Sequence, residues 1–232
     1  MRFIFNTLFE CFVERMMMSL RFVKSVLLLT MLIGLSACAA GRSVVSIPLP
    51  NSESNPVNGV DIKLVAVTDN RVFQVKPGVP EVPSLSEDEE INSGIKARAY
   101  ARKRGDWGQG LGDVILPEGE TVVGVMTQYM QSAFQNAGYR VLSEGDAGYD
   151  SAIPVTVRIV QFWCWVELTV GLSNISEIII RAPDGKLEDV LIVRNKSVHK
   201  AFLSTDEAWQ QCATLGMQEI SAKVSAELRK LQ

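Results

Sequence analysis

An apolar run near the N-terminus, followed by a cysteine, most constrains what this chain can fold into. Arg21 and Lys24 supply positive charge before the run. Residues 26–35 form an apolar stretch of about ten residues, and small residues then lead to Cys38. The stretch has the length of the apolar core of a secretory signal and is too short to span a bilayer, which takes about 20 apolar residues. Only the residues after position 37 are therefore expected to build the folded domain.

The four residues Leu35-Ser36-Ala37-Cys38 resemble the lipobox of bacterial lipoproteins. In those proteins the cysteine thiol takes a diacylglycerol, the peptide before it is removed, and the new amino group is acylated, commonly with palmitate. Several acyl chains, at about 0.8 kcal/mol per buried CH₂, anchor a protein durably. Residue 39 is Ala instead of the Asp that retains many lipoproteins at the inner membrane. The resemblance implies a signal peptide over residues 1–37 and a lipid on Cys38, anchored in the periplasmic leaflet of the outer membrane.

Two other interpretations of this segment stay open. It could be a generic secretory signal with a chance cysteine, or a short buried helix. Against both, the basic flank, the apolar core, the small residues and the cysteine all occur at the spacing of a lipoprotein. Residues 1–17 contain two glutamates, which do not suit the basic start of a signal, and three consecutive methionines end at Met18. We expect translation to start among these methionines and leave residues 1–17 out of the fold.

The net charge and the histidine content restrict the chemistry. A formal net charge of −3 over 232 residues is too near neutral for a general nucleic-acid binder. His199 is the one histidine and lies in a predicted strand, so neither a nucleophile paired with it nor a metal cluster is expected. No glycine-rich segment has the spacing of a phosphate-binding loop. We expect no cofactor, no metal and no enzymatic activity.

Two cysteines remain once Cys11 and Cys38 are assigned to the signal region: Cys164 and Cys212. In the oxidising periplasm an even pair permits a disulfide. The equal alternative is a pair of buried thiols that pack as small apolar side chains.

Composition divides the first half of the mature chain into a tether, a first strand and a long loop. Residues 38–59 are rich in Ser, Pro, Asn and Gly and are expected to form a lipidated, flexible tether that lets the domain stand off the membrane. A strand is expected over 60–68 and a short second strand over 72–75. Residues 77–117 contain prolines, an acidic run and a basic run, and are expected to be a long loop outside the core.

Periodicity predicts the elements that follow. Apolar residues at helical spacing predict a helix over 118–137, ended by Gly138. A proline, an aspartate and a glycine predict a hairpin turn at 183–186. Strands are expected where apolar and polar residues alternate or apolar residues run together: 139–142, 153–166, 175–182 and 190–198.

A final helix is predicted over 205–230, opened by a capping box of Ser204 and Glu207. This order of elements indicates an α+β domain over residues 60–232, with an antiparallel β-sheet and two α-helices packed on one face. The helix face expected to be buried consists of Trp209, Cys212, Ala213, Gly216, Ile220, Val224 and Leu228.

Four stretches carry a family resemblance: QYMQSAFQNAGY at 128–139, VTVRI at 155–159, IIIRAPDGK at 178–186 and ARKRGDWGQ at 101–109. With these, the chain resembles the YajG-like family of small envelope lipoproteins over roughly residues 60–230. The resemblance implies an accessory envelope protein and brings no catalytic residues. The acidic and proline-rich insert at 77–95 departs from the family.

A basic segment is the first candidate binding site. Glycines after it free backbone N–H groups to approach an anion. We hypothesise that it contacts an anionic envelope component, either lipid headgroups or an acidic protein surface. The alternative is that its charges pair with the acidic run at 87–90, whose own binding of a divalent cation is less expected than simple solvation. The candidate residues are Lys96, Arg98, Arg102, Lys103, Arg104 and Trp107.

The aromatic segment at 161–165, with sequence QFWCW, is the second candidate. Because side chains alternate along a strand, it must put aromatic surface on both sides of the sheet. Helices can cover one side, and the other is either covered by loops or exposed to dock a partner.

The expected function follows from the anchor. We expect a non-enzymatic, lipid-anchored interaction or accessory protein that meets the membrane through Cys38 and an envelope protein through its domain. The alternative is a binding lipoprotein that holds a small amphiphile, a glycan fragment or an anionic lipid.

Overall fold

The computed structural model describes residues 41–231 except 52–55, 57–58, 106, 168–169 and 183–189. The signal segment, Cys38 and the hairpin turn expected at 183–186 lie outside the described residues. Among those described, no helix has both the length and the apolar character needed to cross a bilayer.

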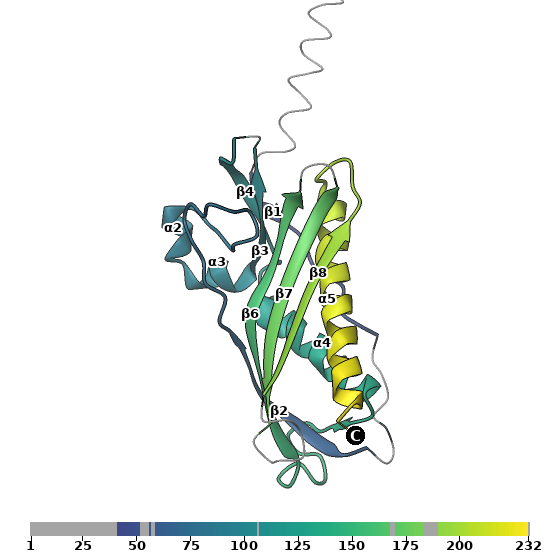
Figure 1. Ribbon diagram of the computed structural model, residues 1–232. Helices are drawn as coiled ribbons and strands as arrows, with labels where there is room; N and C mark the ends of the chain where they lie inside the picture. Colours follow the sequence, from purple (N-terminus) through teal and green to yellow (C-terminus); the bar gives the residue numbers. More distant parts are fainter. Residues whose placement is uncertain are drawn as a thin grey trace, which may run out of the picture. The chain divides into compact units, whose positions relative to one another are not determined.

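An eight-stranded sheet is the centre of the domain (Figure 1). Its longest strand, β6, pairs with β7 along one edge. Along the other edge, β2 pairs with the first half of β6 and β3 meets its second half. The strands are β1 (Ser43–Val44), β2 (Asp61–Asp69), β3 (Ala99–Arg104), β4 (Gly110–Ile115), β5 (Arg140–Val141), β6 (Ile153–Glu167), β7 (Gly171–Arg181) and β8 (Leu191–His199).

The α+β fold class is confirmed, and the sheet is mixed instead of antiparallel throughout. The pairs β3–β4, β6–β7 and β7–β8 are antiparallel, as hairpin neighbours are. The pairs β2–β6, β2–β5, β3–β6 and β1–β4 are parallel. The chain between β2 and β6 includes helix α4 (Val122–Asn136), and a crossover of that kind brings the second strand back in the same direction.

Two long helices, α4 and α5 (Asp206–Arg229), pack on one face of the sheet (Figure 1). All seven residues predicted to form the buried face of α5 are buried. Helix α4 ends as predicted, with Gly138 at a φ of 96°. The predicted capping box of α5 is wrong by one residue, because Thr205 has the extended backbone of an N-cap and its hydroxyl accepts the Ala208 N–H.

Two segments expected to lie outside the fold belong to it. Residues 77–117 hold α2 (Glu87–Glu90), α3 (Ser93–Arg98), β3 and β4, so they are not a long loop. Within 38–59, the expected tether, residues 43–44 form β1, and Val45 and Ile47 are buried. The strand expected over 72–75 is reduced to one bridge between Gln74 and Ser84.

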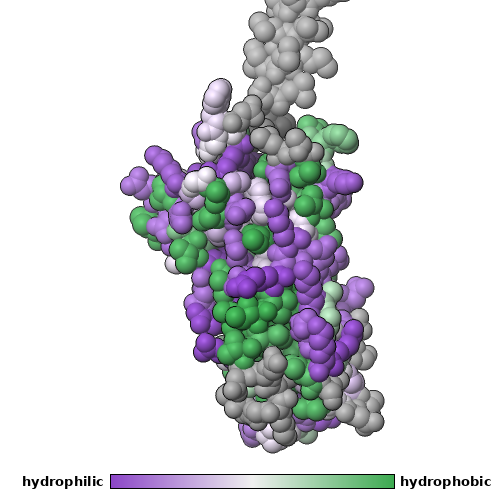
Figure 2. All heavy atoms as spheres, viewed as in Figure 1, coloured by the Kyte–Doolittle hydropathy of each residue, from purple (hydrophilic) through white to green (hydrophobic). Residues whose placement is uncertain are grey.

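A bulge in β6 between Ile159 and Gln161 gives the sheet two apolar cores. Phe162 and Cys164 join the large core under α4 and α5. Trp163 and Trp165 point to the opposite, outer face, where Leu85 covers them together with Ala99, Ile115 and Phe73. Among the described residues, the outer face of the sheet is thus covered along the second half of β6. Beyond that cover, apolar residues gather on the surface over the lower part of β6–β8 (Figure 2).

Candidate functional site

The first described residues are held in the sheet. The Gly41 N–H donates to the Leu111 carbonyl at 2.6 Å, and the Val45 N–H donates to the Ile115 carbonyl at 2.8 Å. Gly112 lets this segment pass close to β4, because a Cβ atom there would collide with the carbonyl oxygen of Gly41. Gly41, three residues after Cys38 in the sequence, is therefore already bonded to the sheet.

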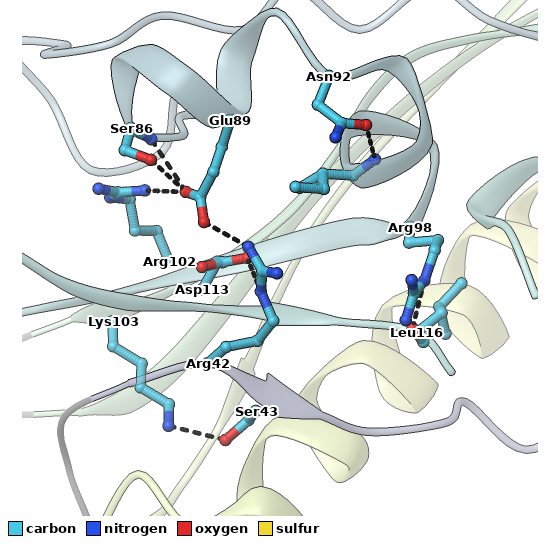
Figure 3. A network of polar contacts seen from close by, with 11 residues as sticks. Arg42, Ser43, Ser86, Glu89, Asn92, Arg98, Arg102, Lys103, Asp113 and Leu116 are labelled. Carbon is cyan, nitrogen blue, oxygen red and sulfur yellow. Dashed lines mark hydrogen bonds and ion pairs between the residues drawn. The ribbon is translucent and has the colours of Figure 1, made fainter. Parts of the chain in front are cut away.

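Ionic contacts of Arg42 hold this segment from one side (Figure 3). Its Nε donates to Asp113 Oδ2 at 3.0 Å, and its Nη2 pairs with Glu89 of α2. Asp113 is only 3% exposed, so Arg42 neutralises a carboxylate that is nearly removed from water. Glu89 also accepts the Ser86 N–H and hydroxyl, as part of the capping box of α2.

Ser43 and the backbone that follows are held from the other side. Lys103 Nζ donates to the Ser43 hydroxyl at 2.7 Å, and that hydroxyl donates to Asp206 in the first turn of α5. The Tyr100 hydroxyl donates to the Val45 carbonyl at 3.1 Å. Burial raises the pKa of Tyr100, which keeps its hydroxyl a neutral donor.

Three of the predicted basic residues lie on β3, and each has a partner within the domain. Lys103 points to the Ser43 side of β3, whereas Arg102 and Arg104 point to the opposite side, because side chains alternate along a strand. Arg102 lies 3.8 Å from Glu89, and Arg104 donates to the Ser84 hydroxyl at 2.7 Å. Burial lowers the pKa of Arg104, and the charge of Arg102 adds to this.

The remaining predicted residues of the basic segment divide into two groups. Lys96 pairs with Glu90 at 2.8 Å, and Arg98 Nε donates to the Leu116 carbonyl at 2.8 Å. Trp107, by contrast, is 93% exposed on the turn between β3 and β4. The six residues are therefore not gathered into one surface. Five make contacts within the domain, two of them with the acidic run, and the aromatic one faces solvent.

Trp107 lies at what we call the Gly41 end of the domain. Besides Gly41, this end comprises residues 107–109 between β3 and β4, the end of β6 at 166–167, the start of β7 at 170–171, and the connection 200–205 between β8 and α5. Strand pairing brings these segments to one end: Ala101 pairs with Cys164 in parallel, and Leu172 pairs with His199. Figure 1 shows β1, β4 and the tips of β6–β8 at this end.

Apolar side chains are exposed on the turns of the Gly41 end. Phe202 is fully exposed, Leu203 is 74% exposed, and Val166, Val170 and Val198 are each partly open to solvent. Behind them is a cleft of about 620 Å³. Its lining consists of Val166, Glu167, Val170, Gly171, Leu172, Val198, Lys200, Ala201, Phe202, Leu203 and Ser204.

The aromatic segment and the two cysteines are interior features. Trp163 and Trp165 are covered by residues of the 71–115 segment, so these two side chains do not form an exposed docking surface. The cover comes from α3, β3 and β4 as well as from the connecting residues Phe73 and Leu85, and not from loops alone. Cys164 and Cys212 are buried, free thiols that lie against each other, with Asn174 donating to Cys164 Sγ at 3.3 Å. The hydrogen bond to Cys164, together with burial, raises the pKa of Cys212.

His199 ends β8 and is half-buried, and it is paired with Leu172 across the strands. Within the described part of the chain, no three His, Cys, Asp or Glu side chains come together as metal ligands.

Sequence reasoning missed the residues that give the Gly41 end its character. Arg42 and Ser43 lay in the expected tether, where the neighbouring sequence does not indicate which residues they contact. Phe202 and Leu203 carried a signal that could have been used, because two large apolar residues stand in a short polar connection just before a helix cap.

No family model and no curated protein matches the sequence. Solved structures give remote similarities. A protein described only as uncharacterized has a TM-score of 0.45 at 9% identity, covering 81% of this chain and 97% of its own. A Xanthomonas campestris protein of family DUF330 has a TM-score of 0.41 at 7% identity, covering 80% and 91%. A minor lipoprotein from Acinetobacter baumannii has a TM-score of 0.32 at 4% identity, covering 45% and 83%. Similarities this remote do not define the family of the chain.

Proposed function

We propose that the chain is a lipoprotein, anchored through Cys38 in the periplasmic leaflet of the outer membrane, whose α+β domain is a non-enzymatic envelope accessory module. The observation that carries the proposal is the series of basic flank, apolar run, small residues and cysteine at 21–38. The hydrogen bond from Gly41 to Leu111 supports it, because Gly41 stands only three residues after Cys38 and a lipid there would be joined to the domain by a short link.

Intact mass and membrane fractionation of the full chain in a Gram-negative host test the anchor. The wild type should lose residues 1–37, gain the mass of a diacylglycerol and an acyl chain, and fractionate with the outer membrane. Cys38→Ala should do none of these. If both proteins are soluble and unmodified, the anchor is refuted.

A separate experiment tests whether the protein is in the outer or the inner membrane. Ala39→Asp places at that position the residue that retains many lipoproteins at the inner membrane. It should keep the lipid mass and move the protein to the inner membrane, with Ala39→Ser as the matched control that stays. Identical fractionation of all three proteins would refute assignment to the outer membrane by residue 39.

An envelope protein partner fits the open part of the outer sheet face. Ile179 pairs with Ile192, which is 49% exposed, and the Glu177–Arg194 ion pair borders them. An apolar centre with a polar rim is typical of a protein interface. A photo-crosslinking residue at Ile192 should capture a defined envelope protein in cells, whereas one at Glu144, on the 143–151 turn, should not. Equal products from both positions would argue against this face.

Binding of a small amphiphile is the second candidate function, and the 620 Å³ apolar cleft favours it. A fluorescent fatty acid below its micelle concentration should bind the full chain. Val198→Trp, which fills the cleft, should weaken binding at least tenfold. The matched control is Ile192→Trp, on the same strand but outside the cleft lining. Equal affinities for the two variants would exclude the cleft.

A further inference from the structure

We infer that the Gly41 end of the domain lies on the bilayer itself, with Trp107, Phe202 and Leu203 inserted at the interface between lipid headgroups and acyl chains. This rests on the proposed anchor at Cys38. It goes beyond that anchor, because it assigns a second membrane contact, made by the folded domain and by side chains far apart in sequence.

Chain length is the first argument. Three residues lead from Cys38 to Gly41, and fully extended they span about 10 Å. Gly41 is bonded to Leu111, and the contacts of Arg42 and Ser43 follow at once. A lipid on Cys38 therefore leaves no long tether. Gly41 can lie no farther than about 10 Å from the residue that bears the lipid.

Exposed apolar side chains also gather at the Gly41 end. The most exposed large apolar residues of the described chain are Phe202, Trp107, Ile91, Leu203 and Val72. Three of these five lie on turns of the Gly41 end. The far end, by contrast, is closed by the 143–151 turn, whose exposed residues include Ser143, Glu144 and Asp146.

The chemistry of the three residues suits a lipid surface. An indole ring prefers the bilayer interface, where its ring is shielded and its N–H stays hydrated, and Phe and Leu gain by leaving water. The charges around them have both signs, with Lys200 and Arg104 beside Glu167 and Asp206. A contact made by apolar side chains with charges of both signs beside it should not require anionic lipid and should depend little on salt.

Tryptophan fluorescence tests the inference directly in the lipidated full chain. The chain has four tryptophans, and Trp163, Trp165 and Trp209 are buried while Trp107 is exposed. In phosphatidylcholine vesicles with lipids brominated near the headgroup, we expect quenching of one component of the emission. Trp107→Phe should abolish that component and leave the buried tryptophans unquenched. Equal quenching in wild type and Trp107→Phe, or none in either, would overturn the inference.

A dye attached to a cysteine gives an independent test of membrane contact in the connection 200–205. Lipid blocks Cys38, and Cys164 and Cys212 are buried, so a dye added to Leu203→Cys marks that position alone. An environment-sensitive dye there should shift to the blue on vesicles, in low and high salt alike. The same dye on Glu144→Cys, at the far end, should not shift. No shift at either position would contradict membrane contact.

Flotation of the same samples separates the two proposals. Wild type that floats with the vesicles but shows neither quenching nor a dye shift keeps its anchor and refutes the contact. Wild type that does not float refutes the anchor and the contact together. A dye shift with a monomeric amphiphile but not with vesicles would overturn the contact in favour of ligand binding in the cleft.

Discussion

At the Gly41 end both faces of β6 are covered, whereas at the far end the described residues cover only the face toward α4 and α5. Phe162 lies in the large core, while Trp163 and Trp165 lie in a second core on the outer face. The far end closes instead with a polar turn and a surface ion pair, Asp61 with Arg140. Extra packing and buried polar contacts therefore gather at the Gly41 end, where the proposed membrane contact would need a fixed orientation.

Removing an aromatic residue from the second core should have the largest effect on stability. Trp163 is fully buried, so Trp163→Ala should cost about 3–5 kcal/mol of unfolding free energy. Urea unfolding followed by circular dichroism measures this. Trp107→Ala is the matched control and should change stability by no more than about 0.5 kcal/mol, because Trp107 is exposed. Similar losses for the two variants would show that the second core does not stabilise this end.

Loosening the polar contacts of Arg42 should have a smaller effect. Arg42→Ala leaves the Asp113 carboxylate buried without its partner, which should cost about 1–3 kcal/mol. Hydrogen exchange should also quicken at Val45. Arg194→Ala is the control, because its pair with Glu177 is exposed and should contribute less than about 1 kcal/mol. Unchanged exchange at Val45 would mean that Arg42 does not hold the segment.

Acid should weaken the far end slightly. The hydrogen bonds from Arg140 hold the pKa of Asp61 below its ordinary value of 3.8, so the pair stabilises the fold above that pH. This contribution is lost as the pH falls through the lowered pKa. Unfolding midpoints measured from about pH 6 to about pH 3 should fall less steeply in Asp61→Asn than in the wild type. Parallel curves would show that the ion pair is not coupled to folding.

Treatment with a reducing agent should have the smallest effect on the stability of the protein. Cys164 and Cys212 are free thiols in the structure, so a reducing agent should leave the melting temperature of the purified protein unchanged. If instead they are joined after export, reduction should remove about 2–5 kcal/mol. Mass spectrometry after alkylation under denaturing conditions counts the free thiols and decides between these outcomes.

Local patterns allowed much of the fold to be predicted. Helix α5 and strands β6, β7 and β8 follow from periodicity, because each buries one regular face against a neighbour. Strand β3 could not be predicted in the same way. Its sequence AYARKR places Lys103 at a buried position that becomes acceptable only through Ser43, sixty residues earlier in the chain.

The candidate site was predicted in part. Trp107 was named for its place beside basic residues, and its exposure makes it the one member of that set free to meet a membrane. The basic residues themselves became structural contacts, because their partners, such as Glu89 and Leu116, come from segments that only folding brings near.

The sequence by itself determined the α+β class and the amphipathic faces of the long helices, and it contains the motif from which an anchor at Cys38 is proposed, since each depends on residues close together in the chain. Tertiary structure alone decided that residues 41–45 join the sheet, and that a bulge in β6 sends Trp163 to a second core. It also decided that Trp107, Phe202 and Leu203 share one end of the domain. These features depend on strand pairing between distant segments, and the free energy of such pairing cannot be predicted from a local sequence pattern.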